Sequence, residues 1–234
     1  MRITERVGFG IPLPKRIRGW YEGSAISVFD LGPTDPETLA LSLDRATETA
    51  AADLFALTDR ELWLVTAQAG SRRGGLIATF VSHASLAPEL PRVLMAVASQ
   101  HFTWELIEAN GAFGLHLIGE EQLDWVWRFG LPSGRDTDKL AGLAIETAVT
   151  GSPLLPGVLG WLDCRVEAKL DMGDRTAYLA EVVAARSIRR AAPLTMQRLM
   201  QLAPAEKRQE LRVLKDHDAA IDAAAIRAWR SGRR

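Results

Sequence analysis

Apolar and polar residues follow a strand pattern through the middle of the chain. Short β-rich runs occupy residues 62–67, 75–82 and 92–98, and turn residues separate them. The first two runs are joined by a glycine-rich connection of hairpin type, whose two arginines are expected to keep its tip solvated. The pattern therefore predicts consecutive antiparallel strands.

Two longer runs, at residues 158–172 and 175–188, alternate apolar and polar positions around the turn Gly173-Asp174. In the first run one face carries Leu162, Cys164, Val166, Ala168 and Leu170, and the other face carries Asp163, Arg165, Glu167 and Lys169. A period of two residues is typical of a strand with one buried face. The runs predict a long, half-buried hairpin.

Helical spacing, caps and breakers predict helices at residues 34–55, 102–110, 120–130 and 194–202, and a longer one from about Pro204. In the second of these, Phe102, Leu106 and Ala109 share one face, and Asn110-Gly111 supplies a left-handed end. Residues 112–118 read as another strand. Hairpin-connected strands with short inserted helices predict an α+β, mainly β, protein built on a closed antiparallel barrel.

The chain divides into three predicted parts. Residues 1–43 are an irregular, glycine- and proline-rich lead with the start of a helix, residues 44–190 are the barrel domain, and residues 191–234 are a helical C-terminal extension. This extension holds nine basic and five acidic residues. The pattern favours a solvated helical arm that packs on the barrel or on a second subunit over an anion-binding tail.

Composition excludes several classes of function. The net charge of -1 gives no strong field for nucleic acid, and the single cysteine, Cys164, excludes an intramolecular disulfide and a four-cysteine metal site. His101 and His217 have no partners at metal-ligand spacing, so no metal site is predicted. No stretch has the length of a signal peptide core or the ~20 apolar residues of a membrane span. We therefore expect a soluble, cytoplasmic protein.

Between Leu62 and Val183 the chain resembles the flavin reductase family, whose fold is an FMN-binding split β-barrel. The matching pieces, in order, are WLVTA, GGLIATFVSHASLAPELPRVL, FTWELIEANGAFGLHLIGEEQ, FGLPSGRDTDK, TGSPLL and LGWLDCRVEAKLDMGDRTAYLAEVV. The resemblance implies noncovalent FMN, with FAD as an alternative, and NADH or NADPH as the reductant. It also implies a homodimer and an oxygenase partner.

The same resemblance assigns roles to individual residues. Ala78, Thr79 and Val81 would line the isoalloxazine ring, and Ser82, His83 and Ser85 would bond the ribityl chain or phosphate. The helix that opens at Phe102 and Thr103 would hold the phosphate at its N-terminus. From the segment FGLPSGRDTDK the resemblance carries over Phe129, Ser133, Gly134 and Lys139.

Two positions depart from the family pattern. Ile77 stands where members commonly have threonine, and Arg175 stands where a histidine lies near the nicotinamide in some members. His83 and Arg175 are thus the candidates for the nicotinamide side, and Arg175 could instead pair with a phosphate of the dinucleotide. No catalytic residue is assigned with certainty, because hydride transfer between cofactors requires no general base from the protein.

Several residues whose side chains could take part in catalysis or ligand binding have simpler, structural interpretations. His116 is predicted to be a hydrogen-bonded structural residue and Cys164 to be inert packing. The tryptophans at 104, 125 and 127 are predicted to pack against the barrel. Residues 71–75 lack the ending of a P-loop and are read as a hairpin turn.

The sequence leads to a principal hypothesis and two alternatives. The principal one is an FMN-binding NAD(P)H:flavin oxidoreductase. The first alternative is a non-enzymatic FMN-binding electron carrier or redox partner, suggested by Arg175. The second is an oxidase of the pyridoxamine phosphate oxidase type or a haem-binding barrel.

Overall fold

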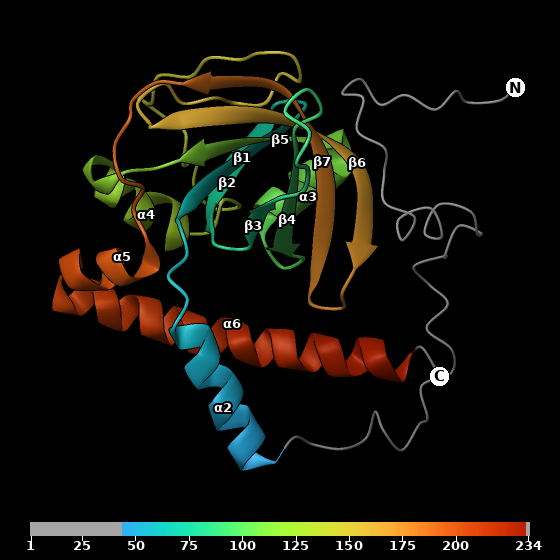
Figure 1. Cartoon of the computed structure of the whole chain (residues 1–234), viewed down its shortest axis with the longest axis vertical. Helices are drawn as coiled ribbons and strands as arrows, with labels where there is room; N and C mark the ends of the chain where they lie inside the picture. Colours follow the sequence, from blue (N-terminus) through green and yellow to red (C-terminus); the bar gives the residue numbers. More distant parts are fainter. Residues whose placement is uncertain (1–43, 233–234) are drawn as a thin grey trace, which may run out of the picture. The chain divides into compact units, whose positions relative to one another are not determined.

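The computed structural model describes residues 44–232, and within this range a seven-stranded antiparallel sheet curls around a core (Figure 1). Its strands are β1 (Trp63–Ala69), β2 (Arg72–Ala78), β3 (Val81–His83), β4 (Arg92–Ala98), β5 (Ala112–Leu117), β6 (Gly160–Asp171) and β7 (Arg175–Ser187). Their order across the sheet is β2-β1-β5-β6-β7-β4-β3. The predicted hairpins and the mainly β class are confirmed.

The helices in the described residues are α2 (Arg45–Ala56), α3 (Phe102–Asn110), α4 (Leu123–Gly130), α5 (Met196–Leu202) and α6 (Ala205–Ser231), with a 3-10 turn at Glu120–Gln122. The Asp44 carboxylate caps α2 by accepting a 2.7 Å hydrogen bond from Thr47 N. The start of this helix predicted at residue 34 lies outside the described residues. Gly111 ends α3 with a φ of 68°, as its sequence predicts. Phe102 and Leu106 are buried as predicted, whereas Ala109 is exposed and Thr103 and Ile107 complete the buried face of α3.

The barrel closes where the sequence predicts one continuous strand. That prediction, for residues 75–82, is wrong in one respect, because the run is divided into β2 and β3. These two strands lie at opposite edges of the sheet, yet only Thr79 and Phe80 separate them in the chain. The two edges must therefore approach each other, and the sheet bends into a split barrel.

Side chains of the sheet alternate between two hydrophobic clusters. Val65 of β1 lies in a cluster with Phe113 and Tyr178, whereas the adjacent Leu64 lies in a second cluster with Phe129. Alternation follows from the two-residue period of a strand. Helix α3 packs on β1 and β2, and α4 packs on β2. Both faces of the sheet are therefore covered near the β1–β2 hairpin.

The β6–β7 hairpin departs from its predicted alternation. Bulges follow Asp163 and Val166, and beyond them Ala168 and Leu170 are exposed although they were expected on the buried face. Asp163, expected on the polar face, is fully buried. Its carboxylate accepts a 2.8 Å hydrogen bond from the backbone N–H of Thr150 and a second from the Thr150 hydroxyl. Residues 167–171 are all exposed, so the far end of this strand has no buried face, which is why the predicted alternation fails there.

The structural roles predicted for His116 and Cys164 are confirmed. Both are fully buried. Nδ1 of His116 donates to the Leu64 carbonyl at 2.9 Å, and Nε2 accepts from the Leu155 N–H at 3.1 Å. Burial raises the pKa of the Cys164 thiol, which keeps it protonated and unreactive. The three tryptophans on α3 and α4 are partly buried in the two clusters, as predicted.

Helices α5 and α6 belong to the same compact unit as the sheet. Figure 1 shows α6 running past the turn that joins β6 to β7. A Cβ atom on Gly173, in that turn, would lie 2.7 Å from Cβ of Trp229. The predicted packing of a helical arm on the barrel is therefore observed, while the domain boundary at residue 191 stays a prediction.

Candidate functional site

The break between β2 and β3 carries the residues predicted to lie along a flavin ring. Ala78 is buried at the end of β2, Thr79 is half-buried, and Val81 packs against the barrel cluster. Ser82 and His83 are exposed on the edge strand β3. The stretch thus presents a small side chain, a hydroxyl and a free strand edge in succession.

The loop after β3 forms its own hydrogen bonds. Ser85 Oγ accepts from the Ala87 N–H at 3.1 Å, and Ser82 Oγ lies 3.3 Å from the His83 carbonyl, to which it donates. Both hydroxyls retain further capacity, because a hydroxyl has one donor and two acceptor positions. The loop is therefore preformed and still able to bond a polar ligand.

The loop between β4 and α3 is fixed by the start of β7. Ser99 donates to the Asp174 carbonyl from its N–H at 3.0 Å and from its hydroxyl at 3.2 Å. His101 caps α3 without a side-chain hydrogen bond, and Thr103, in the first turn, is only 2% exposed. The N-terminus of α3 therefore lies beside the β6–β7 turn.

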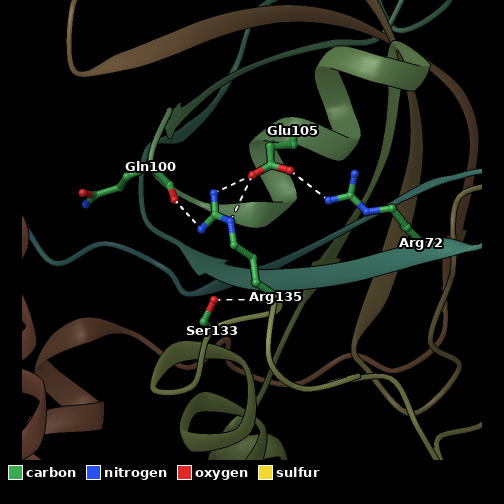
Figure 2. A network of polar contacts seen from close by, with 5 residues as sticks. All are labelled: Arg72, Gln100, Glu105, Ser133 and Arg135. Carbon is green, nitrogen blue, oxygen red and sulfur yellow. Dashed lines mark hydrogen bonds and ion pairs between the residues drawn. The ribbon is translucent and has the colours of Figure 1, made fainter.

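The segment that follows α4 is tied to this same loop. Arg135 donates from Nη1 to the Gln100 carbonyl at 3.0 Å and pairs with the Glu105 carboxylate. Figure 2 shows Glu105 between Arg135 and Arg72, which donates to it at 2.9 Å. The two arginines hold the pKa of Glu105 below its ordinary value through these hydrogen bonds. Glu105 thus joins α3, the β1–β2 hairpin and the segment after α4.

Two of the predicted site residues pack directly on each other. A Cβ atom on Gly134 would lie 2.8 Å from Cδ1 of Phe102, and the Arg72 guanidinium lies 4.7 Å from the centre of the Phe102 ring. Ser133 is exposed and accepts from the Arg135 N–H at 3.2 Å. The small side chain of Gly134 lets its segment approach the start of α3 closely.

Lys139 and Phe129, also predicted for the site, are buried. Lys139 Nζ donates to the Phe129 carbonyl at 2.7 Å and to the Gly75 carbonyl at 3.2 Å. Burial lowers the pKa of Lys139 to about 8, so the ammonium remains mostly charged near neutral pH. The observed contacts give this lysine a structural role, and its contact with a cofactor stays a prediction.

Arg175 is already surrounded by partners. It forms ion pairs with Asp174 and, across to α6, with Asp222. Its guanidinium also lies 4.8 Å from the centre of the exposed Phe80 ring. The two carboxylates neutralise the positive charge with which Arg175 would bind a dinucleotide phosphate, and its role beside the nicotinamide stays a prediction.

Sequence reasoning missed the polar network of Figure 2, formed by Arg72, Gln100, Glu105, Ser133 and Arg135. Glu105 and Arg135 lie 30 positions apart, and no pattern in either segment signals that they meet. Arg72 and Arg73, expected to solvate the hairpin tip, also form ion pairs that the sequence did not predict, Arg72 with Glu105 at 2.9 Å and Arg73 with Asp138 at 2.8 Å.

Two grooves lie among the described residues. One, of about 600 Å³, is lined by the β1–β2 turn, Phe102, Glu105 and residues 134–138. A larger one, of about 850 Å³, lies between Leu131 and α6 and contains none of the predicted flavin residues. We favour the smaller groove as part of the functional region, since two of the predicted site residues, Phe102 and Gly134, line it.

One buried atom beside α3 agrees with a flavin as ligand. Gln100 Oε1 is buried and finds no hydrogen-bond donor among the described residues. Buried acceptors without a partner are rare, and a ribityl hydroxyl or a ring N–H would satisfy this one.

Across residues 44–232, no group of three or more His, Cys, Asp or Glu side chains is placed to hold a metal ion. In the same range, no helix combines the length and the hydropathy of a transmembrane span.

A curled antiparallel barrel with a hydroxyl-rich break at its edge defines the class of split-barrel flavoproteins. The family model of the flavin reductase like domain matches residues 56–202, and the chain belongs to that family.

Named relatives agree with this membership. The chain is 36% identical over 117 residues to the flavin-dependent monooxygenase reductase subunit HsaB of Rhodococcus jostii, covering 50% of this chain and 58% of that protein. It is 31% identical over 113 residues to a flavin reductase of Pseudomonas putida, covering 48% and 63%. The match thus spans less than two thirds of either relative.

A solved structure supports the fold alone. The NADH:FAD oxidoreductase SgcE6 of Streptomyces globisporus superposes with a TM-score of 0.55 at 23% identity, covering 67% of this chain and 90% of that one. The predicted fold class is thereby confirmed.

Proposed function

We propose that this protein binds FMN without a covalent link and transfers hydride from NADH or NADPH to flavin, with FAD as the alternative flavin. One observation carries the proposal. Two segments selected separately from the sequence meet at the start of α3, where a Cβ atom on Gly134 would lie 2.8 Å from Cδ1 of Phe102 and Arg135 donates to the Gln100 carbonyl. FMN would supply the hydride acceptor, and the protein's part is to bind and orient it.

Each segment has a distinct part in this proposal. The flat ring would lie along Ala78, Thr79 and Val81, where side chains are small or aliphatic. Ser82, His83, Ser85 and the free Gln100 Oε1 would bond the ribityl chain. The phosphate would lie at the first turn of α3, by Phe102 and Thr103, because a helix N-terminus favours an anion. Ser133 and Gly134 would form the side of the flavin site next to the start of α3.

The proposed partners follow from surface chemistry and from the relatives. Large apolar side chains are exposed between the break before β3 and the middle of β4: Phe80 at 50%, Leu86 at 101%, Leu90 at 62% and Leu94 at 45%. Exposed apolar side chains of this number within 15 residues of sequence are typical of a subunit interface, which supports a homodimer. Since HsaB is a monooxygenase reductase subunit, we also propose that an oxygenase receives the reduced flavin, in the cytoplasm.

A specific observation favours one alternative, a non-enzymatic FMN electron carrier. Arg175, the candidate for the nicotinamide side, is committed to Asp174 and Asp222. A carrier would bind flavin tightly and receive electrons from another protein. In the second alternative, the barrel is a pyridoxamine phosphate oxidase-like oxidase or binds haem. An absorption spectrum of the purified protein distinguishes haem from flavin.

The enzymatic proposal predicts rapid NAD(P)H oxidation. With added FMN under air, the purified protein should oxidise NADH or NADPH at roughly 1 to 10³ turnovers per second, the usual range for enzymes. Absorbance at 340 nm measures the rate, and a reaction without protein gives the background. FMN binding without oxidation of either dinucleotide would support the carrier instead, and absence of flavin binding would contradict both.

A further inference from the structure

One face of helix α6 contacts residues beside the start of α3, where the flavin phosphate is proposed to bind. Asp218 Oδ1 accepts a 3.1 Å hydrogen bond from Gln100 Nε2, and Asp222 pairs with Arg175. Trp229 packs on Gly173 in the β6–β7 turn. These three helix positions are four and seven residues apart in succession, so they lie on one face. Helix α6 therefore lies against the residues that precede the N-terminus of α3 and against the β6–β7 turn.

This face brings negative charge to the start of α3. His101, the N-cap of α3, is close enough to Asp218 and Asp222 for both to raise its pKa, although burial lowers it overall. Asp174 adds a third carboxylate, and Arg175 and Lys139 are the cations that also act on His101. A carboxylate near a helix N-terminus interacts favourably with the helix dipole. The aspartates of α6 thus supply the anion that this helix end favours.

The carboxylates and a phosphate would compete. Phosphate carries about two negative charges at neutral pH, and at a few ångströms from Asp218 and Asp222 it would meet strong repulsion in a partly buried place. Helix α6 has no fully buried residue, although its partly buried Leu211 packs on the cluster that contains Leu64 and Phe129, so its separation from the barrel would expose little core. The helix is therefore well suited to move away when an anion arrives.

We infer that α6 is an autoinhibitory cover, whose Asp218 and Asp222 occupy the electrostatic position of the flavin phosphate and must withdraw before FMN binds. The inference rests on the proposed function. It also gives Arg175 a part, since this arginine anchors the cover through Asp222. The uncharged riboflavin should be affected less than FMN, because it lacks the phosphate that the carboxylates repel.

Charge-removing variants of the full chain test the cover. We expect Asp218→Asn combined with Asp222→Asn to bind FMN about tenfold more tightly than wild type, with less than a twofold change for riboflavin. The matched control, Glu210→Gln with Asp216→Asn, removes two charges from exposed positions of the same helix and should leave FMN affinity within about twofold. Quenching of flavin fluorescence measures each Kd.

The outcomes separate this inference from the proposed function. Equal FMN affinity in wild type and the Asp218/Asp222 variant would overturn the cover while leaving flavin binding intact. Absence of flavin binding in every variant would overturn the proposed function and the cover with it. Hydrogen exchange on wild type is a second test: FMN should speed amide exchange in residues 205–231, and protection of α6 by FMN would contradict the inference.

Discussion

Replacing Gly75 with alanine is expected to destabilise the barrel by about 3 kcal/mol or more, the upper part of the range for overpacked cores. A Cβ atom there would lie 2.7 Å from the Val65 carbonyl oxygen and 3.1 Å from two ring atoms of Phe129. Val65 and Phe129 are both buried, so neither can yield without disturbing its cluster. Gly75 also accepts from Lys139, and the variant should loosen that contact.

Urea unfolding, followed by circular dichroism, measures this change. The adjacent Gly74→Ala is a matched control, because the three atoms nearest to its added Cβ would be side-chain atoms of Phe102 and Leu106, at 3.0 to 3.4 Å. We expect it to cost about 1 kcal/mol or less, since side chains adjust more readily than backbone. Equal losses in the two variants would show that the approach of Gly75 to β1 is not the constraint described.

The second large effect concerns pH. Burial lowers the pKa of His116 to about 4, from an ordinary value of 6.5. Between these values the unfolded chain binds a proton that the folded protein does not, so stability should fall as pH is lowered through 6.5 and stop falling from this cause near 4. At about 1.4 kcal/mol per pH unit, the whole loss is roughly 3 kcal/mol.

The variant His116→Gln isolates this contribution. Glutamine can donate to the Leu64 carbonyl and accept from the Leu155 N–H, as His116 does, but it does not titrate. Burial also lowers the pKa of His101, and this residue therefore adds a similar dependence of unfolding free energy on pH in wild type and in the variant. Urea unfolding at pH 5 and pH 7 should therefore show a steeper loss in wild type by roughly 2 kcal/mol. Identical slopes would contradict the buried neutral state of His116.

Local signals predicted most of the elements because they depend on neighbouring residues. The predicted runs 92–98 and 102–110 coincide with β4 and α3. The strand composition of the first run and the Asn110-Gly111 end of the second are local signals that define these elements. The split of residues 75–82 was not predictable in this way. Both halves have the same strand composition, and the break arises only because the sheet must close around its core.

The candidate site was predictable only in part, for the same reason. The resemblance selected Phe102 and Gly134, which the structure brings into contact. The ties that hold them, from Arg135 to Gln100 and Glu105, join segments about 30 residues apart and leave no periodic pattern. The docking of Asp218 on Gln100 spans 118 positions, so the cover formed by α6 could be found only in three dimensions.

A crystal structure of the full chain grown with excess FMN tests the central claim most directly. We predict that the isoalloxazine ring lies along residues 78–82 and that the phosphate lies at the first turn of α3, within hydrogen-bond distance of Phe102 N or Thr103. Flavin bound elsewhere, for example in the groove between Leu131 and α6, would contradict the account.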